Sequence, residues 1–240
     1  MCTESTLVRA LPGPDPPSKH HYSFYFQDGL VILNVKGSLY RVHRHLLEHN
    51  SEYFRELLSP GNSSIGPSGA TDDTAISIPD LTSDEFDCLL NFLYYRVYED
   101  STLSVTEWIT LLDVSTRLRF TTIRTLSIRA LSAQRSSLSA VETIVLAIKH
   151  DVPSWLAPAY AELCRRPHPL DDGEAEQLGA KIAARVGRAR ETIRDETFRA
   201  HQEKQYGIRY APPEAFDEEL VNTTVSETFW VGDASNPSRS

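Results

Sequence analysis

The stretch VILNVKGSLYRVHRHLLEHNSEYF, residues 31–54, changes midway from the apolar pattern of a β-hairpin to that of helices. Apolar runs at Leu30–Val35 and Leu39–Val42 flank a turn at Lys36-Gly37, and this arrangement predicts a hairpin. The unbroken first run is typical of a strand that is buried on both faces. Beyond the hairpin the pattern predicts two short helices, and Ser51 stands where it can cap the second.

Further along, TAISIPDL (residues 74–81) predicts a third short strand that ends at Pro79, and helices follow it. Four helix starts have the spacing of a capping box, in which a Ser, Thr or Asp and a Glu three residues later each bond the other's backbone N–H. They are Thr82 with Glu85, Ser104 with Glu107, Ser139 with Glu142, and Asp171 with Glu174. Because strands come first and helices later, we expect an α+β fold with helices packed around a small sheet.

Composition divides the chain into four segments. Residues 1–21 are rich in Pro, Gly and Ser and predict a disordered arm, and residues 22–135 predict the domain that holds the sheet. Residues 136–205 predict a helical extension, and residues 206–240 an acidic, largely disordered tail. In the arm, PDPPSK (residues 14–19) has the P-x-x-P-x-K spacing that proline-binding grooves recognise.

Two features of the C-terminal part lead to further expectations. From Asp171 to about Gln205 a polar helical pattern predicts a single solvent-facing helix with ion pairs such as Asp195 with Arg199. In the tail, Phe229-Trp230 is a candidate partner-binding element.

Charge and cysteine content exclude several classes of function. A net charge of −9 argues against general affinity for nucleic acid or anionic membranes, because phosphate binding needs clustered Lys and Arg. No apolar run approaches the roughly 18 residues of a membrane span. The 3 cysteines are far apart and form no C-x-x-C pair, which suits a reducing compartment. We therefore expect an intracellular protein, in the cytoplasm, the nucleus or both.

His45, Glu48 and His49 have the order H-x-x-E-H of a zinc-peptidase helix, which raises the alternative of a zinc-dependent hydrolase. That chemistry needs a third ligand and a pocket. No recognisable downstream motif supplies the ligand, and burial of Leu46 and Leu47 would turn the three polar residues outward. We expect no metal, no cofactor and no catalytic residue.

The chain resembles the BTB/POZ family from the hairpin through Phe54, and again in ISIPDLTSDEFDCLLNFLYY (residues 76–95). The positions that carry the resemblance are Tyr40, His43, Arg44, Leu47, Ser51, Phe54, Pro79 and Asp80. Of these, His43 is expected to be a structural histidine that fixes the turn between strand and helix by bonding backbone. The likeness covers about residues 22–180, and in its later part it resembles fungal members whose domain continues into a helical extension.

The resemblance implies a non-catalytic interaction module that forms homodimers or higher oligomers. It also implies service as an adaptor, for a cullin-type ubiquitin ligase scaffold or in transcriptional regulation. One position departs from the family: many members carry an Asp in the first strand that builds a charged dimer pocket with the basic residue after the histidine. Here Leu30 occupies that position, while the basic residue is present as Arg44.

Overall fold

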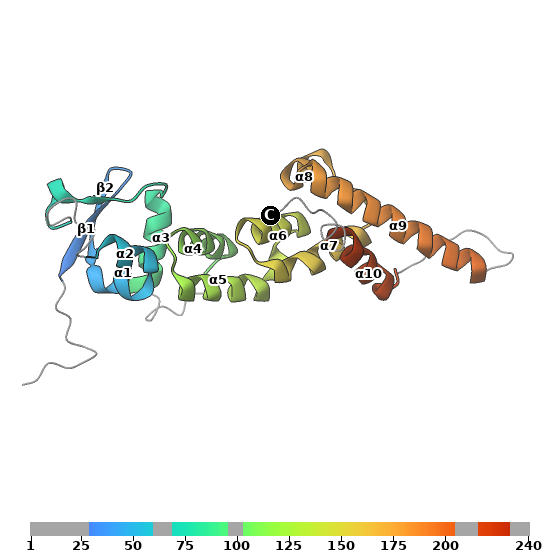
Figure 1. The fold of residues 1–240 in the computed structure, drawn as a ribbon, viewed down its shortest axis with the longest axis horizontal. Helices are drawn as coiled ribbons and strands as arrows, with labels where there is room; N and C mark the ends of the chain where they lie inside the picture. Colours follow the sequence, from blue (N-terminus) through green and yellow to red (C-terminus); the bar gives the residue numbers. More distant parts are fainter. Residues whose placement is uncertain (1–28, 60–68, 96–102, 205–215, 231–240) are drawn as a thin grey trace, which may run out of the picture.

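The protein is described by a computed structural model in residues 29–59, 69–95, 103–204 and 216–230. The molecule is elongated, with a small sheet at one end and helices extending in a row toward the other (Figure 1). The predicted arm, its P-x-x-P-x-K motif, and tail residues 206–215 and 231–240 lie outside the described residues. No helix within the described residues has the length and apolar character needed to cross a bilayer.

The predicted hairpin is confirmed. Strand β1 (Leu30–Val35) pairs antiparallel with β2 (Ser38–His43), and Lys36 and Gly37 turn the chain with φ of 47° and 92°. Strand β3 (Ile76–Ser77) pairs parallel with β1, so the sheet order in the described residues is β2-β1-β3. Every residue of the LVILNV run except Leu30 is at least partly buried, as expected for a strand covered on both faces.

Helices α1 to α5 cover the sheet and enclose the first core. They span α1 Arg44–Asn50, α2 Glu52–Leu57, α3 Ser83–Tyr94, α4 Val105–Arg117 and α5 Thr121–Ala133, with short 3₁₀ turns at η2 Asp72–Thr74 and η3 Arg135–Ser137. The fully buried side chains in this core include Leu33, Leu47, Phe54, Phe86, Leu89, Leu111 and Phe120. The predicted α+β class is confirmed.

A second core lies among the later helices. They are α6 Ala140–Lys149, η4 Pro153–Trp155, α7 Leu156–Arg165, α8 Asp172–Leu178, α9 Ala180–Lys204 and α10 Glu218–Phe229. All four predicted capping boxes are present and open α3, α4, α6 and α8. Local sequence therefore marks where these helices begin.

The segment expected to be one solvent-facing helix is instead two helices, and the longer is partly buried. Gly179 separates α8 from α9 with a φ of 76°, a conformation that glycine adopts at little cost. Val186, Ala189 and Ile193 of α9 are buried in the second core. These three apolar residues form too narrow a stripe to be recognised in the sequence among the charged residues around them. The expected Asp195–Arg199 pair is not among the ion pairs of the described residues.

The tail also differs from expectation, because residues 218–229 form α10, which packs on α7 and α9. Val221, Val225 and Phe229, four residues apart, share one face of the helix and are buried. Phe229 stacks on Tyr160 of α7, with ring centroids 3.8 Å apart. The acidic side chains of its described part, Asp217, Glu218, Glu219 and Glu227, are exposed, so they do not oppose packing.

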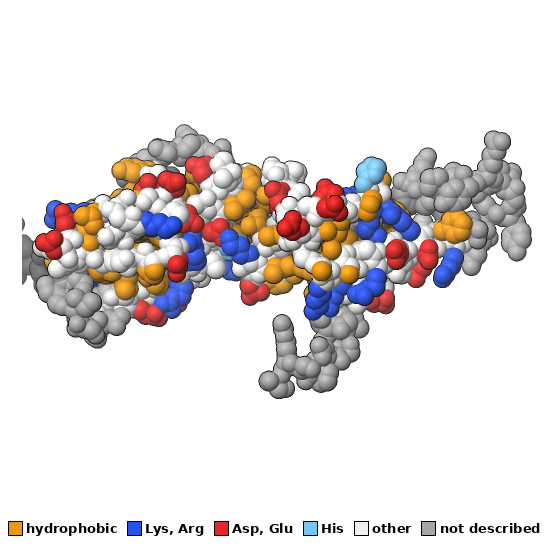
Figure 2. Space-filling model, turned by 90° about the horizontal axis from the view of Figure 1, so that it is seen from above, with side chains coloured by type: hydrophobic (Ala, Val, Ile, Leu, Met, Phe, Trp, Pro, Cys, Tyr) orange, Lys and Arg blue, Asp and Glu red, His pale blue; other side chains and the backbone are white. Residues whose placement is uncertain are grey.

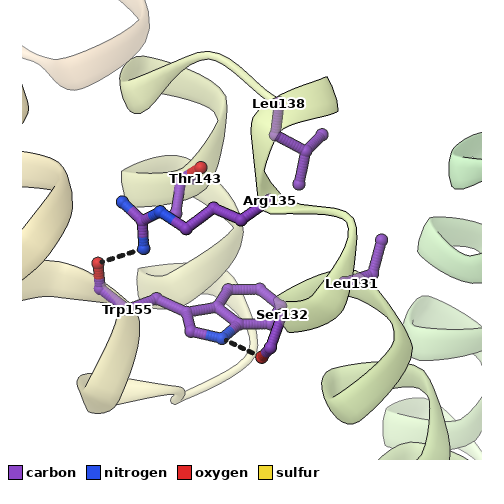
Figure 3. Close-up of a pocket in the computed structure, with 6 residues that line it drawn as sticks. All are labelled: Leu131, Ser132, Arg135, Leu138, Thr143 and Trp155. Atoms are coloured by element: carbon purple, nitrogen blue, oxygen red, sulfur yellow. Dashed lines mark hydrogen bonds between the residues drawn. The ribbon is translucent and has the colours of Figure 1, made fainter.

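The two cores meet at a joint between α5 and η4 (Figure 3). Trp155 donates from its indole Nε1 to Ser132 Oγ at 2.8 Å, and its carbonyl accepts from Arg135 Nη1 at 3.5 Å. Leu131, Leu138 and Thr143 complete the lining of a cavity of about 10 Å³, room for about one water. Leu156, next along the chain, contacts both cores. The helical extension is thus packed directly against the first core.

Candidate interaction surfaces

Three of the residues singled out in the sequence are core residues. Leu47, Ser51 and Phe54 are fully buried. The Ser51 hydroxyl accepts from the Phe54 backbone N–H at 3.1 Å, which caps α2, and donates to the Leu118 carbonyl at 2.6 Å. Ser51 therefore links the start of α2 to the end of α4, and this part of the motif stabilises the fold rather than presenting a surface.

Tyr40 lies in β2, and Pro79 and Asp80 lie between β3 and α3. The Tyr40 ring meets Phe86 edge to face, with centroids 4.9 Å apart. Asp80 has a φ of 56°, and its carbonyl accepts from Arg117, which also pairs with Glu85. Burial alone would raise the pKa of Glu85, but hydrogen bonds from Thr82 and Arg117 hold that pKa below its usual value. The turn at Pro79-Asp80 is thus held in place by Arg117 of α4.

Arg44 is engaged within its own domain. Its guanidinium donates to the Leu58 carbonyl and, from Nε at 3.0 Å, to Glu48 Oε1. A charged pocket between two copies would need this guanidinium to face an acid across the interface. Leu30, at the position where family members carry that acid, is 43% exposed. The side chains here suit an apolar contact better than a charged one.

The zinc-peptidase pattern does not assemble a metal centre. The rings of His45 and His49 stack with centroids 5.4 Å apart, and Glu48 is paired with Arg44. Within the described residues, no group of three or more His, Cys, Asp and Glu side chains is placed to hold a metal ion. The glutamate that would activate water is instead held by an arginine, so this arrangement does not favour hydrolysis.

His43 lies on the surface beside a group of exposed apolar side chains, and its partner differs from the backbone contact expected for it. Its Nδ1 lies 3.0 Å from the Tyr94 hydroxyl, which also accepts from the His43 backbone N–H at 2.9 Å. Leu30 is paired with His43 across the hairpin, and Tyr95, 60% exposed, lies beside Tyr94. We call Leu30, His43, Tyr94 and Tyr95 the hairpin-end surface.

The outer face of the hairpin extends this surface. Side chains that alternate along β1 and β2 point away from the core, and Leu39, 49% exposed, is on the same face as Leu30. Sequence reasoning did not single out Tyr94, Tyr95 or Leu39. The only available signal was the period-two pattern of β2, which does not say whether another segment covers the outward side.

Comparison with known families decides the nature of the N-terminal part: residues 30–135 match the BTB/POZ domain family model. The chain contains a BTB/POZ domain. It reaches from β1 to η3 and includes all eight motif residues. Helices α6 to α10 lie beyond the match, and a search of curated proteins found none that matches the chain. A BTB/POZ domain is a protein–protein interaction module and is typically non-catalytic.

On the rest of the described surface, the exposed large apolar side chains lie on or beside different helices: Ile148, Phe198 and Trp230. On the face seen in Figure 2 they occur in small groups separated by charged side chains, over both the BTB/POZ domain and the extension. Ile148 of α6 is one such side chain, 53% exposed. Isolated exposed apolar residues are ordinary in soluble domains, whereas the contiguous hairpin-end surface is a better candidate for a contact.

Proposed function

We propose that the protein is a non-catalytic adaptor that self-associates through the hairpin-end surface of its BTB/POZ domain. BTB/POZ domains mediate protein binding and dimerisation, which supports the general role. The observation that carries the specific proposal is the exposure of Leu30, which is paired with His43, and of Tyr95, which lies beside Tyr94. A surface of this kind suits a twofold contact, because each copy supplies the same apolar side chains.

Self-association is tested by light scattering with size-exclusion chromatography on the full chain, diluted from roughly 100 µM to 1 µM. We expect twice the chain mass for the wild type. Leu30→Asp and Tyr95→Asp are expected to shift the population toward monomer, because each places a charge in the contact. Ile148→Asp, a matched change on an exposed apolar residue of α6, should leave the dimer intact. A wild-type monomer at every concentration removes self-association and leaves an adaptor for a different partner.

For the partner, we propose a cullin-type scaffold, with transcriptional regulation as the other role that the family resemblance implies. A helical unit packed directly on the domain supports placement with the fungal members that carry such an extension, and it gives a scaffold a second element to contact. A pull-down of a purified cullin by the full chain tests this. Binding by the Leu30→Asp variant as well would show that the scaffold site and the dimer site are separate.

We also propose the cytoplasm or nucleus as its location. Cys88 and Cys164 are free thiols, as expected in a reducing compartment. Imaging of a tagged full-length chain in cells checks this.

A further inference from the structure

His150 follows the last residue of α6, where the extension meets the BTB/POZ domain, and it is only 3% exposed. Its Nε2 lies 2.9 Å from Asp113 Oδ1 of α4, and Lys149 Nζ lies 2.6 Å from the same oxygen. From α5, Arg124 Nη2 donates to the His150 carbonyl at 2.5 Å. One histidine thus contacts two helices of the domain from the end of the first helix of the extension.

The surroundings of the ring favour its neutral form. Burial lowers the pKa of His150, and the cations of Lys149 and Arg124 lower it further, while Asp113 raises it. Nδ1 is buried without a hydrogen-bond partner among the described residues, so a proton there would have no acceptor. The contact of Nε2 with Asp113 is short but lacks hydrogen-bond geometry.

A proton from solvent nevertheless has a route toward the ring. The lining of an adjacent cavity of about 360 Å³ comprises Glu85, Asp113, Thr116, Arg117, Lys149 and His150. Glu85 is already paired with Arg117, and Asp113 with Lys149, so the charges of this cavity largely satisfy one another. Asp113 is therefore the acid that faces His150, and it is shared with a lysine.

We propose that His150 is an acid-sensitive catch that holds the helical extension closed against the BTB/POZ domain. When the His150 ring is neutral, the extension packs against the domain. When the ring is protonated, the contact contains a poorly compensated positive charge beside Lys149 and Arg124, and the extension separates from the domain. The pKa of His150 is lower in the closed form than the ordinary 6.5 that it regains on opening. Closure is therefore fully stable above about pH 6.5 and weakens as the pH falls below it.

Hydrogen exchange on the full chain, corrected for the intrinsic effect of pH, tests the catch at pH 7.5 and 5.5. Protection of residues 140–165 is expected to fall at pH 5.5 relative to that of β1 and β2, by at most about tenfold per pH unit because one proton is bound. His150→Gln should abolish this difference. His168→Gln, on an exposed histidine of the extension, should retain it. The same pH response in His150→Gln as in the wild type overturns the proposal.

A second measurement can overturn the proposal with the wild-type protein alone. The ring of His150 in the wild-type protein is titrated by NMR, with its resonance assigned through the backbone. We expect a midpoint below 6.5, and a still lower one in Asp113→Asn, because the carboxylate that favours the charged ring is lost. A midpoint at or above 6.5 in the wild type overturns the catch.

Discussion

Replacement of Phe229 by alanine tests whether α10 is part of the folded extension. The side chain is 7% exposed in the second core and stacks on Tyr160 with an interplanar angle of 11°. Its ring closes the end of the apolar face that also contains Val221 and Val225. Removal of the ring leaves a cavity between α7 and α10 that flanking side chains only partly fill.

The magnitude follows from the burial. Phe→Ala changes in a core cost about 3–5 kcal/mol, and an aromatic pair adds roughly 0.5–1.5 kcal/mol beyond area burial. The loss cannot exceed the free energy with which α10 docks, because beyond that point the helix simply detaches. We therefore expect a decrease in unfolding free energy of about 3 kcal/mol, which for a chain of this size lowers Tm by roughly 6–12 °C.

The assay combines thermal unfolding with limited proteolysis read by mass spectrometry. Phe229→Ala should lower Tm and expose residues 218–229 to cleavage. The neighbouring Trp230 is 41% exposed, so Trp230→Ala is the matched control and should cost less than about 1 kcal/mol. Equal effects of the two variants, or rapid cleavage of wild-type α10, would refute docking of this helix.

Two further predictions concern single polar side chains. Ser51→Ala should lower the unfolding free energy, measured by urea denaturation, by about 1–3 kcal/mol. The reason is that the Phe54 N–H loses its acceptor and the Leu118 carbonyl loses its donor. A change below about 0.5 kcal/mol would contradict this. The hydrogen bond from Arg166 lowers the pKa of Glu174 to about 2, so this group contributes stability above its ordinary 4.5 that is lost as the pH falls toward 2. The drop in Tm between pH 5 and pH 3 should therefore be smaller in Glu174→Gln than in the wild type, and an equal drop would count against the pair.

The local features of the fold could be predicted from the sequence because their causes lie within a few residues of one another. The turn at Lys36-Gly37 needs positive φ, and each capping box is an exchange of hydrogen bonds across three residues. The role of Ser51 as a cap was predicted on the same basis. Its second hydrogen bond, to a carbonyl 67 positions away, was not predictable.

The sequence by itself thus determined the hairpin, the helix starts and the α+β class, because neighbouring residues carry those signals. Tertiary structure alone decided that α10 docks, that Arg44 bonds the Leu58 carbonyl, and that His150 lies buried beside Asp113. Burial, ion pairing and pKa depend on which distant segments displace water from a side chain. The sequence pattern of a mostly polar helix such as α9, or of an acidic tail, is the same whether or not its few apolar residues are buried against another segment.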